Sequence, residues 1–172
     1  MNAITKLTST INDPRVSSLN KLTEICKTID IAVPHANRIS LWRFLGEGEE
    51  IECLKVLDPF NESTEGQILR QEDFPIYFEH IKNNQVVLAS DARHNYVTKC
   101  FNQDYFEPLN IYSLLDFVIH NEHKPAGIIC CERVGDQICW DKTDKVAIKR
   151  IANVMSLYIS GEFESCELNR PS

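Results

Sequence analysis

The chain has 172 residues, of which 43% are hydrophobic and 25% charged, and its formal net charge is −7. The length fits one domain with a substantial core, whereas the acidic balance argues against nucleic-acid binding and no apolar stretch reaches the roughly 20 residues of a membrane span. The seven cysteines lack the spacing of a disulfide framework, which favours the reducing cytoplasm. The first residues also lack the apolar core of a signal peptide.

The first 30 residues are predicted to be a helical segment. Ile4, Leu7 and Ile11 suggest a short first helix. Pro14, after the capping residues 12–13, marks the start of a second helix that an apolar stripe carries to about residue 29.

Strands dominate the next part of the chain. Residues 38–45 and 51–57 are predicted to be two strands joined by a glycine-containing turn. Residues 58–73 are expected to be mostly loop, with a short strand near 67–70, and residues 74–81 a short helix. Residues 85–90 are predicted to be a third strand, and residues 94–108 an aromatic-rich helix or loop.

Two apolar runs, 113–120 and 126–134, flank a polar break and predict an antiparallel hairpin. Alternation along the strands separates a wholly apolar face from a mixed face that carries two carboxylates. The apolar face, suited to packing under helices, has Leu115, Phe117, Ile119, Ile129 and Cys131; the mixed face has Leu114, Asp116, Val118, Ile128, Cys130 and Glu132. A five-residue turn places Asp116 roughly opposite Cys130.

The last helix is predicted over about residues 141–160, with Asp141 as its N-cap, and a polar tail over 161–172. Two adjacent apolar seams on this helix span about half its circumference, more than one sheet-facing side needs. Either the N-terminal helix or a partner subunit covers the surplus. In the second case we expect a homodimer interface made of Leu19, Leu22, Cys26, Ile148, Ala152, Met155 and Ile159.

The order of these elements resembles a GAF domain over residues 31–160. The resemblance is carried by Arg38-Ile39-Ser40-Leu41-Trp42-Arg43-Phe44, Val86-Val87-Leu88-Ala89-Ser90-Asp91-Ala92, the stretch 109–116, and Gly127-Ile128-Ile129-Cys130-Cys131-Glu132 before Trp140-Asp141. Residues 66–78 look like the GAF subgroup at the input end of bacterial histidine kinases and diguanylate cyclases. The resemblance implies an α+β sandwich with a central antiparallel sheet of about six strands. It places terminal helices on one face of the sheet and a ligand cavity on the other.

Other chemistries are not supported by the residues. The stretch 58–93 has no cysteine for a methionine-sulfoxide reductase, the neighbours of Cys100 do not reproduce the Cys-His pair of bilin attachment, and the cyclic-nucleotide signature is absent. Zinc spacing and nucleophile motifs are missing as well. We therefore expect no enzyme, no bound metal and no covalent chromophore, with any other cofactor unknown.

The mixed face of the hairpin is the candidate floor of a ligand cavity, with aromatic side chains as its walls. Asp116 could equally accept backbone hydrogen bonds, Asp91 could cap a turn, and the aromatic residues could simply be core. Glu132 is expected to be solvated or paired with Arg133 or Lys55. The candidate ligand-binding residues are Asp116, Leu114, Val118, Cys130, Phe74, Tyr77, Phe78, Asp91, Tyr96 and Tyr105.

Three functions fit the sequence. The first is a non-catalytic sensory domain that binds a small cytoplasmic ligand and signals through terminal-helix packing in a homodimer, to an output domain or partner. The second is a dimerisation or interaction scaffold with a vestigial cavity. The third is a redox sensor, which requires a low-pKa cysteine lining the cavity.

Overall fold

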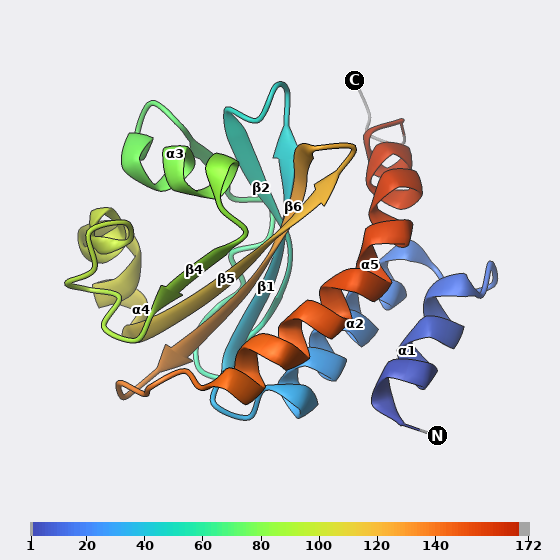
Figure 1. The fold of residues 1–172 in the computed structure, drawn as a ribbon, viewed down its shortest axis with the longest axis horizontal. Helices are drawn as coiled ribbons and strands as arrows, with labels where there is room; N and C mark the ends of the chain where they lie inside the picture. The colour runs from blue at the N-terminus through green and yellow to red at the C-terminus, as the bar shows by residue number, and fades with distance from the viewer. Residues whose placement is uncertain (1, 169–172) are drawn as a thin grey trace.

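The computed structural model describes residues 2–168, except the side chains of residue 157 and of 159–168, and these residues form three layers (Figure 1). A six-stranded sheet in the order β3-β2-β1-β6-β5-β4, with every pair antiparallel, is the middle layer. Its strands are β1 (Arg38–Leu45), β2 (Glu50–Leu57), β3 (Ile68–Arg70), β4 (Val86–Ala89), β5 (Ile111–Asn121) and β6 (Lys124–Val134). This sheet confirms the predicted α+β fold.

The helices at the two ends of the chain cover one face of the sheet, and short helical segments lie beyond the other (Figure 1). The first set, here called the helix layer, contains α1 (Ala3–Asn12), α2 (Ser18–Ala32) and α5 (Lys142–Leu168). The second set contains α3 (Pro75–Asn83), the 3₁₀ turn η1 (Lys99–Phe101), the π-helical turn η2 (Asn102–Phe106) and the single α-turn α4 (Glu107–Leu109). The N-terminal helices thus pack into the same core as the rest of the chain.

The second helix begins at Ser18 rather than at Pro14, so the predicted start was wrong. Asp13 accepts a hydrogen bond from the backbone N–H of Arg15, which closes a turn around the proline. The Ser17 side chain then caps the helix by accepting from the N–H of Asn20 at 3.2 Å. The proline therefore belongs to the link between the first two helices.

The surplus apolar arc of α5 is covered within the chain. Leu22 and Cys26 of α2 and Ile148, Ala152 and Met155 of α5 are all buried in the core of the helix layer. In the predicted interface set, Leu19 is 58% exposed, and the side chain of Ile159 lies outside the described residues. Of the two predicted alternatives, the N-terminal helices rather than a partner subunit therefore cover this surface of α5.

The final helix is longer than predicted, since α5 continues to Leu168 where the sequence suggested a tail from residue 161. Its start agrees with the prediction. The N–H of Asp144 donates to the side chain of Asp141 and the N–H of Asp141 donates to that of Asp144, each at 2.9 Å. This reciprocal capping box defines the N-terminus of α5.

The β5–β6 hairpin closes more tightly than expected, through Glu122 and His123, which both have positive φ as a type I′ turn requires. A register irregularity next to Ile119 adds one residue on the β6 side. The bulge compensates for the shorter turn, and Asp116 lies opposite Cys130 as predicted. The hairpin therefore presents the expected apolar face to the helix layer and the mixed face to the opposite side.

Candidate functional site

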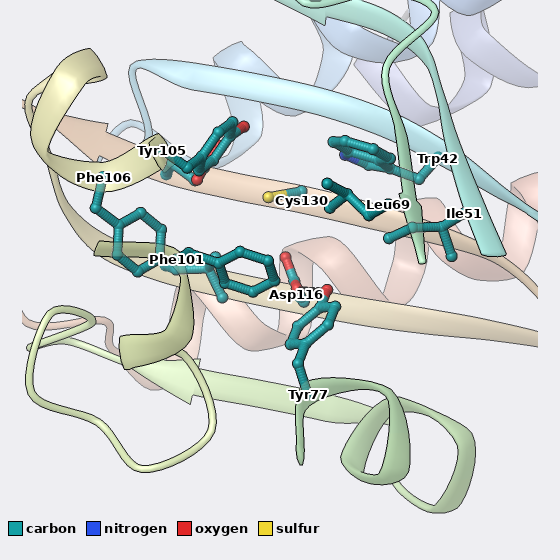
Figure 2. A pocket seen from close by; sticks show the side chains of 11 residues that line it. Trp42, Ile51, Leu69, Tyr77, Phe101, Tyr105, Phe106, Asp116 and Cys130 are labelled. Carbon is teal, nitrogen blue, oxygen red and sulfur yellow. Dashed lines mark hydrogen bonds between the residues drawn. The ribbon is translucent and has the colours of Figure 1, made fainter. Parts of the chain in front are cut away.

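A small cavity of about 30 Å³ lies on the mixed face of the sheet, between the strands and the short helical segments (Figure 2). Strand residues form its floor and aromatic rings form most of its walls. The lining consists of Trp42, Ile51, Leu69, Tyr77, Phe101, Tyr105, Phe106, Leu114, Asp116, Cys130 and Glu132. A volume of this size has room for a water molecule or a similarly small group.

Asp116 provides the first of two buried carboxyl groups in this cavity. The residue is 1% exposed, and its Oδ2 accepts a hydrogen bond of 2.5 Å from the hydroxyl of Tyr77 on α3. Figure 2 shows the tyrosine hydroxyl pointing at the carboxylate. The other oxygen, Oδ1, is buried without a hydrogen-bond partner among the described residues. Burial raises the pKa of Asp116 from 3.8 to about 6, although Tyr77, Cys130 and His80 act in the opposite direction.

Glu132 provides the second carboxyl group and is fully buried, which contradicts the prediction of a solvated residue or a pair with Arg133 or Lys55. Its Oε1 lies 3.3 Å from Nε of Arg38, the residue opposite it on β1, and accepts from the hydroxyl of Tyr105 at 3.3 Å. Its Oε2 is unpartnered within the described part of the chain. Burial raises the pKa of Glu132 from 4.5 to about 7, against the opposing effect of Arg38.

Arg38 joins this cavity to the loop that follows β2. The guanidinium is completely buried and donates to Oδ2 of Asp58 at 2.8 Å, to the hydroxyl of Thr64 at 2.9 Å and to that of Tyr105 at 3.2 Å. Burial alone would raise the pKa of Asp58, but hydrogen bonds from Asn61 and Arg38 outweigh it, so this pKa is lowered. One buried cation is therefore shared between Asp58 and Glu132.

The aromatic walls come from segments that are irregular in sequence. Phe101 ends η1, and its ring centroid lies 4.8 Å from that of Tyr77 and 5.8 Å from that of Phe106. Tyr105 lies in the π-helical turn η2, a geometry that is uncommon and often occurs at functional sites. The hydroxyl of Tyr105 contacts both Arg38 and Glu132, so this ring closes one side of the cavity.

The structure brings half of the predicted ligand-binding residues together at the cavity, namely Leu114, Asp116, Cys130, Tyr77 and Tyr105. Phe74, Phe78 and Val118 belong to the surrounding apolar cluster without lining the cavity. Tyr96 is 67% exposed. The carboxylate of Asp91 is also exposed and bonds the His94 ring at 2.9 Å, so it does not line the cavity.

Of the other six lining residues, Glu132 was placed on the mixed face and Phe106 among the expected aromatic walls, whereas the remaining four and Arg38 were missed by the sequence reasoning. Arg38, Ser40 and Trp42 alternate along β1 and lie opposite Glu132, Cys130 and Ile128 of β6. Applying the period-2 rule to β1 as well as to the hairpin would have found Arg38 and Trp42. Ile51, Leu69 and Phe101 carried no comparable signal, because their positions depend on how β2, β3 and η1 fold over the sheet.

Two further groups are candidates for a functional role: Cys130, as a redox-sensing thiol in the cavity, and a cluster of metal-ligating residue types outside it. Cys130 lines the cavity, but burial raises the pKa of its thiol well above the ordinary value. Ligand atoms of His35, Asp141 and Asp144 lie within 4.8 Å of one another at the start of α5. His35 Nδ1 bonds Asp144 at 2.9 Å and the two aspartates form the capping box, so we assign this group a role in capping the helix.

No known protein family matches this chain by sequence, and no curated protein does. Among the described residues, no helix combines the length and hydropathy that a membrane crossing requires.

Solved structures, in contrast, match over most of the chain. The GAF domain of an Acinetobacter phosphoenolpyruvate-protein phosphotransferase has a TM-score of 0.74 at 11% identity and matches 96% of this chain and 95% of its own. The GAF domain of a two-component sensor histidine kinase from Bacillus halodurans has a TM-score of 0.67 at 19% identity, with coverages of 88% and 97%.

A third match is the chromophore-binding domain of a Stigmatella aurantiaca phytochrome, with a TM-score of 0.67 at 14% identity. Here 90% of this chain is covered but only 58% of the phytochrome chain. At these identities the comparisons establish the fold, which is the GAF fold.

Proposed function

We propose that this chain is a non-catalytic sensory domain, which binds a small molecule in the cavity at Asp116 and Glu132 and transmits its presence to α5. Two of the similar folds belong to a sensor histidine kinase and to a phytochrome, which supports a sensory role. The ligand site is argued from this chain's own residues.

The observation that carries the proposal is a pair of buried carboxyl groups that the fold leaves incompletely satisfied. Asp116 Oδ1 and Glu132 Oε2 have no geometrically defined hydrogen-bond partner among the described residues. Both side chains face the same cavity, where the weakly donating Cys130 thiol interacts with each carboxyl group and lowers its pKa. Leaving a buried polar atom unpaired costs about 1–3 kcal/mol. Natural proteins retain such local costs mainly where function requires them.

The cavity and the helix layer lie on opposite faces of the same two strands, β5 and β6. Asp116 and Glu132 face the cavity, while their neighbours Leu115 and Cys131 face the opposite core with Ile148 of α5. A shift of β5 or β6 on ligand binding therefore changes the surface on which α5 packs. The ligand acts as a signal only if it binds the two arrangements with different affinity.

The proposal is tested by native mass spectrometry of the purified protein, followed by thermal-shift screening of small metabolites. Hydrogen exchange then compares β5, β6 and α5 with and without a bound compound. We expect a non-covalent ligand that raises the melting temperature and changes exchange in α5. A ligand that binds but leaves α5 unchanged would contradict the transmission step.

A scaffold function is the second candidate, because the side chains leave only about 30 Å³ of the cavity open. It is favoured if no compound binds and if filling the cavity, for example by Leu114→Phe, stabilises the fold without affecting any partner. The redox alternative gains no support, since burial raises rather than lowers the pKa of Cys130.

The homodimer, the cytoplasmic location, and the absence of a covalent chromophore and of nucleic-acid partners stay predictions. Because Leu22, Cys26, Ile148, Ala152 and Met155 are already buried within the chain, a homodimer would have to use exposed positions such as Leu19. Size-exclusion chromatography with light scattering on Leu19→Glu tests this interface, and an unchanged mass would argue against it.

A further inference from the structure

The chemistry of the cavity points to the class of its ligand. Among the described residues that line the cavity, the unpartnered buried atoms are Asp116 Oδ1 and Glu132 Oε2, carboxylate oxygens that accept hydrogen bonds when ionised. The Cys130 thiol, which lies between them on the floor of the cavity, is only a weak donor. Arg38 contacts the other carboxyl oxygen of Glu132, Oε1, and also pairs with Asp58. The cavity thus offers acceptors that a donating ligand would satisfy.

The walls favour the same kind of ligand. Trp42, Tyr77, Phe101, Tyr105 and Phe106 supply five aromatic rings around two carboxyl groups. The face of an aromatic ring attracts a cation, and this attraction is stronger where water is excluded. Rings and carboxylates together therefore fit a positively charged group better than a neutral or negative one.

A second hollow adjoins the cavity at the surface. A cleft of about 360 Å³ is lined by Thr64, Glu65, Gln67, Asp104, Tyr105, Pro108 and Leu109. Within the part of the chain that the structure describes, neither hollow has Lys, Arg or His in its lining. Lys55 lies 3.4 Å from Glu65 and partly offsets the charge of that one carboxylate. The acidic character therefore continues from the cavity to the surface.

Among the described residues, Tyr105 alone lines both hollows and therefore lies between them. The hydroxyl is held by two long hydrogen bonds, at 3.2 Å to Arg38 and 3.3 Å to Glu132. Turning this side chain aside would cost those two hydrogen bonds and the ring contacts with Phe101, Phe106 and Arg38, and would join the cavity to the cleft.

Resting on the proposed function, we propose that the ligand is a small primary ammonium compound, with its charged head in the cavity and its tail in the cleft once Tyr105 turns aside. The N–H groups of the head donate to Asp116 and Glu132, and the charge lies among the aromatic rings. A quaternary ammonium group carries the same charge without N–H donors, so the two unpartnered oxygens disfavour it.

The test compares four probes in isothermal titration calorimetry at millimolar concentration: n-butylammonium, tetramethylammonium, n-butyrate and n-butanol. We expect n-butylammonium to bind at least tenfold more tightly than the other three. Asp116→Asn keeps the shape of the side chain and should weaken n-butylammonium binding at least tenfold. The matched control, Asp30→Asn on an exposed position of α2, should leave it unchanged.

A second readout follows from the titratable groups around the head: Asp116, Glu132, Cys130, Tyr77 and Tyr105, with His80 and Arg38 nearby. The pKa values of about 6 for Asp116 and about 7 for Glu132 mean that part of this pair is protonated at pH 6.5. A bound cation favours the ionised forms, so binding at this pH should release a net proton, measured as a dependence of the heat on the buffer.

The outcomes separate this inference from the proposed function. Binding of n-butyrate or n-butanol, with n-butylammonium inactive, overturns the ligand class and leaves the sensory site standing. Equal binding of n-butylammonium to wild type and Asp116→Asn places the ammonium elsewhere and overturns the inference as well. If neither these probes nor the wider metabolite screen binds, both proposals fail together.

Discussion

The two faces of the β5–β6 hairpin bury their residues in different ways. Toward the helix layer, Leu115, Phe117, Ile129 and Cys131 pack against aliphatic side chains of α2 and α5. Toward the cavity, the alternate positions include Asp116 and Glu132, which are as deeply buried but carry ionisable groups. One pair of strands thus separates a core that only packs from a cluster that also holds charge.

This difference indicates where stability and function reside. On the helix-layer face of the hairpin, burial of apolar surface is the stabilising contribution. The buried charges elsewhere on that side of the sheet, Arg43 of β1 and Glu52 of β2, pair with each other at 3.3 Å. On the cavity side, the single cation Arg38 compensates the carboxylates of Asp58 and Glu132. One carboxyl oxygen of Asp116 and one of Glu132 have no geometrically defined hydrogen-bond partner among the described residues. Changes to charge should therefore affect the cavity side strongly, and the following experiments test that contrast.

The largest effect is expected from Arg38→Met. Removing the guanidinium leaves Asp58 and Glu132 buried without their cation, and breaking a buried ion pair in this way costs about 3–5 kcal/mol. Urea unfolding at pH 8 measures the loss. Arg70→Met is the matched control, because the ion pair of Arg70 with Glu50 is half-exposed and contributes at most about 1 kcal/mol. Equal losses in the two variants would contradict the proposed importance of the buried network.

The second effect concerns pH. Folding raises the pKa of Asp116 from 3.8 to about 6 and that of Glu132 from 4.5 to about 7, so the folded protein holds these protons more tightly than the unfolded chain. Their contribution is fully present below about pH 4 and is lost as pH rises to about 7. For Asp116 alone the change is on the order of 3 kcal/mol.

We therefore expect the free energy of unfolding in urea to be higher at pH 5 than at pH 8. Asp116→Asn should reduce this difference, because an amide does not titrate in this range. The variant should also be more stable than wild type at pH 8, while the two differ little at pH 4. A wild-type protein that gains stability from pH 5 to pH 8 would show that these carboxyl groups are not buried as described.

The sequence was sufficient to predict which face of the hairpin meets the helix layer, but only part of the cavity side. Alternation identified Leu115 and Cys131 as facing one way and Asp116 and Cys130 as facing the other, because the side-chain period of a strand depends on local geometry alone. It did not predict that Glu132 pairs with Arg38, since that contact joins residues 94 positions apart through the β1–β6 pairing.

The walls of the cavity were harder still. Tyr96 was predicted as a lining residue and is exposed, whereas Phe101, five residues later, lies at the centre of the aromatic cluster. The segment from η1 to α4 combines 3₁₀, π and α turns, so no single period relates its residues to one face. Only the tertiary packing decides which ring enters the cavity.

A third experiment uses two neighbouring cysteines that face opposite sides of the sheet. Cys131→Ser places a hydroxyl in the apolar helix-layer core and should cost about 1–3 kcal/mol in urea unfolding. Cys130→Ser places a better donor beside Asp116 and Glu132 and should be neutral or slightly stabilising. The same chemical change thus reports on each face separately. If Cys130→Ser is the more damaging variant, the cavity does not need a donor.

The smallest effect is expected where the helix layer joins the sheet, at the cap of α5. Asp144→Ala removes the hydrogen bond to the N–H of Asp141 and the partner of His35, and losing such a cap costs about 1 kcal/mol. The hydrogen bond to Asp144 raises the pKa of His35, so this contact stabilises the fold below the ordinary pKa of histidine and is lost as pH rises. The variant should therefore lose more stability at pH 5.5 than at pH 8, with His35→Gln as the comparison. Unlike Asp116→Asn, this variant removes no group that lines the cavity, because α5 lies on the far side of the sheet. A change in ligand affinity in Asp144→Ala would therefore report the reciprocal coupling between the start of α5 and the cavity, whereas an unchanged affinity would show that transmission does not involve the cap.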